Sequence, residues 1–376
     1  MENKDLKLCV YAIAKNESNK VDQWVEALRG EADCVVVLDT GSTDDTFEKL
    51  KKYEPFVKAE QFDYMKELGY FRFDKARNDS LKMVPYDVDI CVILDLDHIA
   101  RPGWAKIIKE HFAEGYQYVN GYIIDHSDNV KEGLSQWTSH NVHPNSPDWY
   151  WEKIIHEGID YRGSGQVKGI FDERFIIDHY PEESKDRSLY KTLLEYACKE
   201  YPKDPYYGIF LGIELDRRYS SEEAAKAFRR CINECEFNTH EEKTYQYQCY
   251  INLARLVDPE EGIKLMEECR GLNLYESRRF YNVLADLYES VGRYDDAIES
   301  LQQALNVESN SNAWVDDEQY YNGFIEDRLS LFYYYQKRDP YTAAKYGITA
   351  LSKDPSNRRI MDNIKFYVED MESRQG

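Results

Sequence analysis

The feature that most constrains this chain is a change of hydrophobic period near residue 185. Before it, short apolar runs alternate with amphipathic stretches, a pattern typical of βαβ units around a mostly parallel sheet. After it, apolar residues recur at helical spacing and the strand pattern fades. Because 376 residues exceed what one hydrophobic core usually supports, we predict two domains. An α/β domain would cover 1–184, and an all-α domain would cover 185–376.

Acidic residues follow two of the predicted strands directly. The apolar runs that predict buried strands are 8–13, 34–38, 88–94 and 118–124. Asp39 ends the second run, and an Asp-x-Asp motif, Asp95 and Asp97, ends the third. In open α/β sheets, ligands bind beyond the carboxyl ends of the strands. We therefore expect these three carboxylates to lie at a ligand site.

The second half of the chain contains one clear repeat unit, at 284–305. Its Leu, Ala, Tyr and Gly spacing is typical of a tetratricopeptide unit, which is two antiparallel helices with small residues where they cross. Weaker copies occur at 211–232 and 329–354, and a degenerate one at 250–269. Stacked repeats form a curved surface with a concave face. This surface would bind a protein, a peptide or a glycan, or else it would serve as a scaffold or a homodimer surface.

The formal net charge of −22 argues against nucleic acid as a partner, since binding a phosphate backbone depends on Lys and Arg. An acidic protein can still hold a sugar nucleotide by placing a divalent cation, Mn²⁺ or Mg²⁺, between its carboxylates and the diphosphate. Two carboxylates two residues apart face opposite ways on a straight strand. Where the strand opens into a loop, however, Asp95 and Asp97 can both approach one cation, which predicts a metal site there.

Cysteine usage and the first residues of the chain indicate a compartment. The eight cysteines form no C-x-x-C pair and have no nearby histidine at zinc spacing. The first residues show no long apolar stretch followed by a small-residue cleavage site. No run approaches the roughly 18 apolar residues that span a bilayer. The sequence therefore predicts a cytoplasmic protein without a membrane span.

Four short motifs resemble, in order and spacing, those of the family 2 glycosyltransferases of GT-A fold. They are AKNE at 14–17, VVVLDTGSTDDT at 35–46, FDKARN at 73–78 and LDLD at 94–97. The resemblance covers roughly residues 6–180. It implies a Rossmann-like GT-A domain that moves a sugar from a nucleotide-diphospho-sugar, such as a UDP-sugar, to a protein, peptide or glycan acceptor.

The segments after these motifs are similar to one branch of that family. WEKIIHE at 151–157 is followed by His179-Tyr180 and then by the helical repeats. This order resembles the branch with a tetratricopeptide tail, which includes peptide S-glycosyltransferases acting on bacteriocins.

The resemblance also implies roles for single residues. Those expected to bind the nucleotide sugar are Ala14, Asn16, Glu17, Asp39, Arg77, Asn78 and Asp95. Asp39 would hold the nucleobase or ribose, and Arg77 would meet the diphosphate or the base. Asp95 would lie near the sugar and ribose. Asp97 would ligate the metal, with His179 completing the metal shell.

The catalytic base must be a carboxylate on the face of the sugar opposite the nucleotide. In an inverting transfer, it takes the proton of the attacking hydroxyl or thiol. Glu157 is the predicted base, with His156 beside it in a catalytic, acceptor-site or core role. The other carboxylates that could serve as the base are Asp125, Asp128 and Asp148.

The chain departs from the family pattern in two places. His98 follows the second aspartate where the family commonly has Glu, so a third carboxylate near the metal is missing. A Gly-Glu-Asp acid motif of many members is also absent, which leaves His156-Glu157 as the only obvious substitute.

Two other functions stay open from the sequence. The chain could be a repeat-based scaffold whose nucleotide-binding domain has lost catalysis, although the intact Asp-x-Asp motif, Asp39 and Arg77-Asn78 disfavour this hypothesis. It could also be a nucleotidyltransferase. Such enzymes usually carry a Gly-rich loop with Arg and Lys after the first strand, however, and 14–17 contains no Gly.

Overall fold

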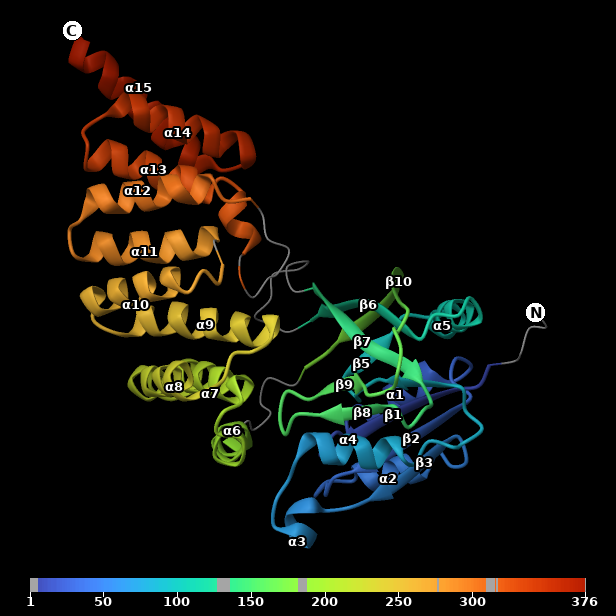
Figure 1. The fold of residues 1–376 in the computed structure, drawn as a ribbon. Coiled ribbons are helices and arrows are strands. Elements are labelled where there is room, and N and C mark those ends of the chain that lie inside the picture. Colours follow the sequence, from blue (N-terminus) through green and yellow to red (C-terminus); the bar gives the residue numbers. More distant parts are fainter. Residues whose placement is uncertain are drawn as a thin grey trace. The chain divides into compact units, whose positions relative to one another are not determined.

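In the computed structural model, the chain divides into two compact units, Met1–Leu189 and Tyr190–Gly376 (Figure 1). The structure describes residues 6–126, 136–181, 188–275, 277–308, 315 and 317–375. The first unit contains a large sheet. In the second unit, the described residues form helices joined by turns and loops, and none of them forms a strand. The predicted order of an α/β domain and an all-α domain is therefore confirmed. The predicted boundary between 184 and 185 falls outside the described residues.

The N-terminal unit is built on an eight-stranded sheet with the order β3-β2-β1-β4-β7-β6-β10-β5. Its strands are β1 Leu8–Ala14, β2 Cys34–Asp39, β3 Val57–Gln61, β4 Ile90–Ile93, β5 His98–Ala100, β6 Tyr118–Asp125, β7 Gln136–Pro144 and β10 Gly169–His179. The strands β3, β2, β1 and β4 are parallel. In contrast, β7 is antiparallel to both neighbours and β5 is antiparallel to β10. The sheet is thus parallel in one half and mixed in the other.

The other elements that the structure describes in this unit are five helices and a small hairpin. They are α1 Val21–Leu28, α2 Thr46–Lys51, α3 Tyr64–Leu68, α4 Phe73–Leu81, α5 Trp104–Ala113, β8 Trp149–Glu152 and β9 Gly158–Tyr161. Val10 of β1 joins a buried cluster with Trp24 of α1 and Trp104 of α5. Tyr11 points to the opposite face and joins a second cluster with Trp151 of β8. Because β1 is buried on both faces, its sequence is a continuous apolar run.

The C-terminal unit is a succession of helices packed as antiparallel pairs (Figure 1). The helices are α6 Ser188–Glu200, α7 Pro205–Arg218, α8 Ser221–Glu234, α9 His240–Leu256, α10 Pro259–Gly271, α11 Arg278–Ser290, α12 Tyr294–Leu305, η1 Glu318–Tyr321, α13 Phe324–Tyr335, α14 Pro340–Lys353 and α15 Arg358–Gln375. The predicted unit at 284–305 falls on α11 and α12. Small residues allow close crossing, as predicted: a Cβ added to Gly212 of α7 would lie 2.3 Å from Cε1 of Phe228 in α8. Of the helices that the structure describes, none is both long enough and apolar enough to cross a membrane.

Candidate active site

The carboxyl ends of the parallel strands place Asp39 at one edge of the sheet. Asp39 ends β2 beside Ala14 of β1 and is fully buried. Its Oδ1 accepts hydrogen bonds from the backbone N–H groups of Gly41 and Ser42, at 3.0 and 2.8 Å, and from Gln61 Nε2 at 3.0 Å. Its Oδ2 is buried and has no hydrogen-bond partner among the described residues. A buried acceptor without a donor is costly, so a hydroxyl or N–H group of a ligand would stabilise this side chain.

The loop after β1 is joined to the loop after β2. Asn16 Oδ1 accepts a hydrogen bond from the backbone N–H of Thr43 at 2.8 Å, and the Asn16 N–H donates to Ser42 Oγ at 2.9 Å. Glu17 is buried, and its carboxylate forms an ion pair with Lys20 at 2.8 Å. Asn16 and Glu17 thus hold the rim of the site together. Direct contact of either side chain with a nucleotide stays a prediction.

Arg77 is the centre of a buried ion-pair network. It lies on α4 and donates to both carboxylate oxygens of Asp95, with Nη2 at 2.7 Å from Oδ2. Its Nε donates to Glu157 Oε1 at 3.1 Å, and its guanidinium carbon lies 5.1 Å from the centroid of the Trp151 ring. The predicted diphosphate ligand is therefore also the residue that orients Asp95 and the predicted base.

The network sets the protonation of its two carboxylates differently. Burial opposes ionisation of Asp95, but the charge and hydrogen bonds of Arg77 outweigh burial, and the pKa of Asp95 is lowered. At Glu157, burial has the larger effect and the pKa is raised despite Arg77. A carboxylate with a raised pKa is a stronger proton acceptor. The environment of Glu157 therefore suits a general base.

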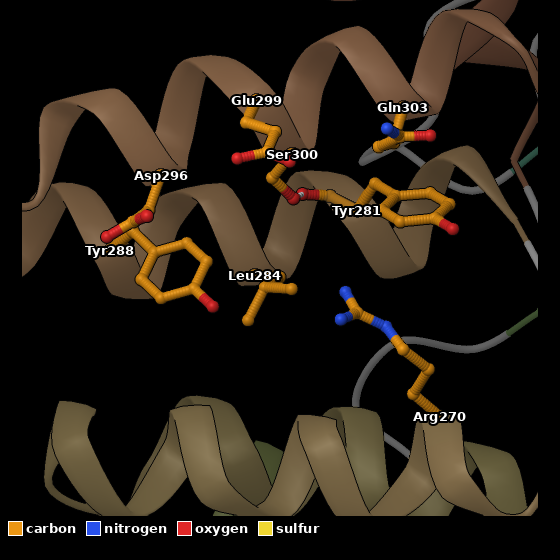
Figure 2. Close-up of a pocket in the computed structure, with 8 residues that line it drawn as sticks. All are labelled: Arg270, Tyr281, Leu284, Tyr288, Asp296, Glu299, Ser300 and Gln303. Carbon is orange, nitrogen blue, oxygen red and sulfur yellow. Dashed lines mark hydrogen bonds between the residues drawn. The ribbon is translucent and has the colours of Figure 1, made fainter.

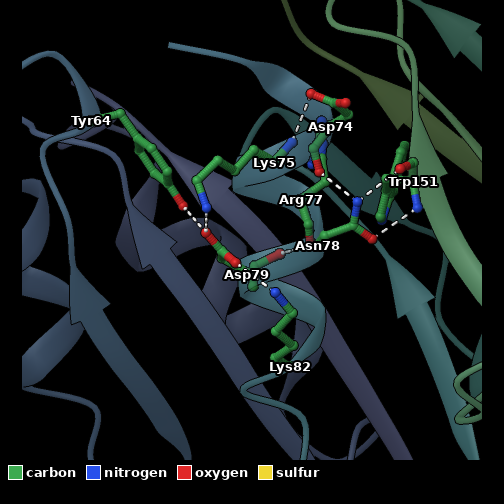
Figure 3. A network of polar contacts seen from close by, with 9 residues as sticks. Tyr64, Asp74, Lys75, Arg77, Asn78, Asp79, Lys82 and Trp151 are labelled. Carbon is green, nitrogen blue, oxygen red and sulfur yellow. Dashed lines mark hydrogen bonds and ion pairs between the residues drawn. The ribbon is translucent and has the colours of Figure 1, made fainter. Parts of the chain in front are cut away.

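Asn78 fastens the β8 strand to α4 (Figure 3). Its Oδ1 accepts from the Trp151 backbone N–H at 2.9 Å. Its Nδ2 donates to the backbone carbonyls of Trp151 and Asp74, at 2.7 and 2.8 Å. Trp151 in turn donates from Nε1 to the Tyr11 hydroxyl at 3.0 Å. A nucleotide contact from Asn78 would compete with these bonds, so its predicted role in binding stays a prediction.

A second cluster lies on the other side of the Asp-x-Asp motif. Asp97, His98 and His179 each offer one ligand atom, and these atoms all lie within 4.8 Å of one another. His179 Nε2 is 3.7 Å from Asp97 Oδ2, and His179 Nδ1 is 3.7 Å from Asp125 Oδ1. Strand register assembles this group, because His98 of β5 and Asp125 of β6 both pair with His179 of β10.

The two aspartates of the motif serve different groups. Asp95 pairs with Arg77, whereas Asp97 lies with the two histidines. We expected both carboxylates to approach one cation, but the structure places Asp95 and Asp97 in different groups of side chains. In the sequence, His98 was noted only because it stands where the family commonly has Glu. In the structure it is a third potential ligand. No local signal could have identified it, because its partner is 81 positions further along the chain and meets it through register alone.

The residues of this cluster are chemically suited to a divalent cation. His98 Nδ1 is buried without a hydrogen-bond partner among the described residues, and burial lowers the pKa of His98. Burial opposes ionisation of Asp97, but the neighbouring His179 outweighs it, and the pKa of Asp97 falls below its usual range. Metals bind neutral imidazole and ionised carboxylate. The residues present therefore fit a metal site.

Of the remaining predicted residues, two are described and one lies outside the described residues. His156 is exposed, with a left-handed φ of 55°, in the connection between β8 and β9 that also carries Glu157. Asp148 is exposed and bonds to Ser146 in the turn before β8. Asp128 is outside the described residues. The catalytic role of His156 and the choice of base stay predictions.

The C-terminal unit has a cavity of its own, of about 360 Å³. Figure 2 shows its lining residues, Arg270, Tyr281, Leu284, Tyr288, Asp296, Glu299, Ser300 and Gln303. The carboxylates of Asp296 and Glu299 come from α12, and the ring of Tyr288 comes from α11. Carboxylates beside an aromatic ring form a suitable environment for a cationic side chain. Arg293 of the chain itself takes up part of this environment, because its guanidinium carbon lies 4.5 Å from the centroid of the Tyr288 ring and its Nε donates to Asp296 at 2.6 Å.

Comparison with known proteins supports both halves of the fold. Residues 9–179 match the family model described as glycosyl transferase family 2, and residues 279–311 match a tetratricopeptide repeat model. The SPbeta prophage-derived glycosyltransferase SunS of Bacillus subtilis (strain 168) is 22% identical over 227 residues, as is the glycosyltransferase SunS of Bacillus phage SPbeta. These matches cover 59% of this chain and 52% of each relative, so the chain spans about half the length of the curated relatives it matches. The resemblance predicted from four motifs is confirmed.

Solved structures are similar to parts of the chain. A thermophilic tetratricopeptide protein of Thermus thermophilus has a TM-score of 0.33 and 18% identity, covering 47% of this chain and 88% of that chain. A crystal structure of MamA has a TM-score of 0.34 and 19% identity, covering 45% and 89%.

Proposed function

We propose that this protein, whose N-terminal unit is a family 2 glycosyltransferase domain and whose C-terminal unit carries a tetratricopeptide repeat, is an inverting glycosyltransferase. It would move a sugar from a nucleotide-diphospho-sugar, such as a UDP-sugar, to a protein or peptide acceptor. The observation that carries this proposal is that one domain combines a buried strand-end carboxylate with an unsatisfied oxygen, a carboxylate held by Arg77, and a cluster suited to a cation.

The donor side uses three groups. Asp39 Oδ2 would accept from the nucleobase or a ribose hydroxyl, because that oxygen is buried without a donor among the described residues. Arg77 holds Asp95 in one orientation through two hydrogen bonds, which positions Asp95 toward the sugar and ribose. A divalent cation held by Asp97 and His179 would stabilise the charge on the departing diphosphate.

The acceptor side requires one proton transfer. The acceptor oxygen or sulfur forms a bond to the anomeric carbon while the bond from that carbon to the diphosphate oxygen breaks. Glu157 would take the acceptor's proton, and the hydrogen bond from Arg77 Nε to Oε1 orients its carboxylate. A thiol, with an ordinary pKa of about 8.5, requires less help from the base than an alcohol.

The repeats would hold the acceptor. Asp296 already pairs with Arg293 at 2.6 Å, so Glu299 is the carboxylate of this cavity that would complement a Lys or Arg side chain of a peptide. Glu299→Lys should weaken transfer to the peptide and leave donor hydrolysis unchanged. Glu372→Lys, at an exposed position on α15, is the matched control. A homodimer surface on the repeats and a cytoplasmic location also stay predictions.

One experiment tests the enzyme hypothesis directly. The protein is incubated with a panel of sugar nucleotides, with a divalent metal or with EDTA, and nucleotide release and thermal shift are measured. We expect one donor to stabilise the protein and to be hydrolysed only with metal, and Asp97→Ala to lose both effects. If no donor binds and Asp97→Ala behaves like the wild type, the chain is a scaffold and not a transferase.

A further inference from the structure

We infer that the cation centre of this domain is a two-histidine, one-carboxylate site formed by Asp97, His98 and His179, which selects transition-metal ions such as Co²⁺ or Zn²⁺ over Mg²⁺. The inference rests on the proposed function only for what the cation does during transfer. The identity of the ligands and the choice of metal depend on the three side chains alone.

The geometry of the three side chains is close to that of a bound ion. Their ligand atoms lie within 4.8 Å of one another. Around one tetrahedral ion, ligand atoms that are each bound at about 2.1 Å lie about 3.4 Å apart. Side-chain rotations that draw the three atoms inward would therefore close the set. The antiparallel pairing of β5 with β10 keeps His98 opposite His179 while they do so.

Two observations beyond proximity point to a ligand. Nδ1 of His98 is buried without a hydrogen-bond partner in the described part of the chain, and leaving such a nitrogen unsatisfied is costly. His179 presents Nε2 to Asp97 and Nδ1 to Asp125, at 3.7 Å in each case. Metal-bound histidines usually have a carboxylate on the other ring nitrogen, which orients the ring and raises its basicity. Asp125 lies on that side of the His179 ring, at an ion-pair distance that is longer than a hydrogen bond.

The ligand types decide the metal. Mg²⁺ takes oxygen ligands almost exclusively and is usually held by one or two carboxylates with waters and phosphates. Imidazole suits zinc, iron, nickel and copper, and affinity for a given site rises from Mn²⁺ through Co²⁺ to Ni²⁺. His98 replaces an oxygen ligand by nitrogen, so two of the three protein ligands are imidazoles. Three protein ligands also leave open positions for oxygens of a substrate.

Direct metal titration of the full-length protein tests this assignment. The protein is stripped with EDTA and titrated with Co²⁺, Zn²⁺, Mn²⁺ and Mg²⁺, with calorimetry, thermal shift and the visible absorption of bound Co²⁺ as readouts. We expect one Co²⁺ per chain, with a visible spectrum that Zn²⁺ abolishes and that a large excess of Mg²⁺ does not. Tighter binding of Mg²⁺ than of Co²⁺ by the wild type would overturn the inference.

Variants at His98 test whether this residue binds the metal or only lies near it. His98→Gln should weaken Co²⁺ binding by on the order of 10- to 100-fold or more, and His98→Glu should shift the preference toward Mg²⁺. His126→Gln is the control, because His126 is exposed and its Nε2 lies 2.8 Å from Asp178. Circular dichroism without metal verifies that each variant is folded. Unchanged Co²⁺ affinity in a folded His98→Gln protein would remove His98 from the site.

The same measurements distinguish the inference from the proposed function. Metal binding is read without a sugar donor, so loss of the transferase hypothesis would leave the Co²⁺ result intact. Conversely, a protein that transfers sugar with Mg²⁺ and retains its metal preference in His98→Glu would keep the proposed function and refute the inference.

Discussion

Replacing Arg77 by Met should destabilise the N-terminal unit strongly, because it leaves two partly buried carboxylates without their cation. The side chain of Arg77 is 8% exposed, and it pairs with Asp95 and with Glu157, whose side chains are 29% and 12% exposed. Removing one partner of a buried ion pair costs about 3–5 kcal/mol. For a unit of this size, about 2–4 °C per kcal/mol converts that loss into a decrease in melting temperature of roughly 6–20 °C.

The destabilisation should also depend on pH in a defined direction. In the wild type the pKa of Asp95 is lowered, so its contribution to stability is present above its unfolded pKa of about 3.9 and is lost as the pH falls through the folded value. In Arg77→Met, burial is the largest influence that remains on this carboxyl, and we expect its pKa to rise above the unfolded value. Protonation then relieves the destabilisation. The stability difference between variant and wild type should therefore narrow as the pH falls from about 8 toward about 5.

Urea unfolding followed by tryptophan fluorescence measures this effect. Five of the six tryptophans precede residue 189, so the signal reports mainly the N-terminal unit. Arg101→Met is the matched control, since Arg101 also pairs bidentately with a carboxylate, Asp178 at 2.9 Å, but is 47% exposed. An exposed pair contributes about 0–1 kcal/mol. Equal losses for Arg77→Met and Arg101→Met, or a gap that widens at low pH, would refute the reasoning.

Three further predictions concern the base, the donor pocket and the repeats. Glu157→Gln should lower the transfer rate by about 10²- to 10⁴-fold in a single-turnover assay. Wild-type activity should fall as the pH drops through the raised pKa of Glu157. A flat pH profile of the wild type would argue against Glu157 as the base. Asp39→Asn should weaken donor binding in calorimetry without changing metal binding, because it lies outside the cation cluster; unchanged donor affinity would exclude it from the nucleotide pocket. Gly212→Ala should lower the unfolding free energy by about 1–3 kcal/mol, because the added methyl group overpacks against Phe228. Gly271→Ala is the control and should leave the unfolding free energy unchanged, since an added Cβ there meets nothing within 4 Å.

Residues whose position depends on local pattern were predictable. The apolar run before Asp39 determines that this carboxylate ends a buried strand, since period and composition require no distant partner. The helix pair at 284–305 was predictable for the same reason, as its small residues lie within one repeat. The orientation of a strand-end side chain was not predictable, and Asp95 therefore turned out to face Arg77 and not the cation cluster.

The sequence by itself determined the two-part organisation, the strands that lead to Asp39 and Asp97, and the family 2 motifs, because each depends on neighbours along the chain. Only the tertiary structure decided that Arg77 holds Asp95 and Glu157, and that His98 lies opposite His179. Both arrangements join segments that are distant in sequence. The β8–β9 hairpin and the β5–β10 register are set by how side chains pack across the sheet, and a one-residue shift in register would turn every side chain to the other face.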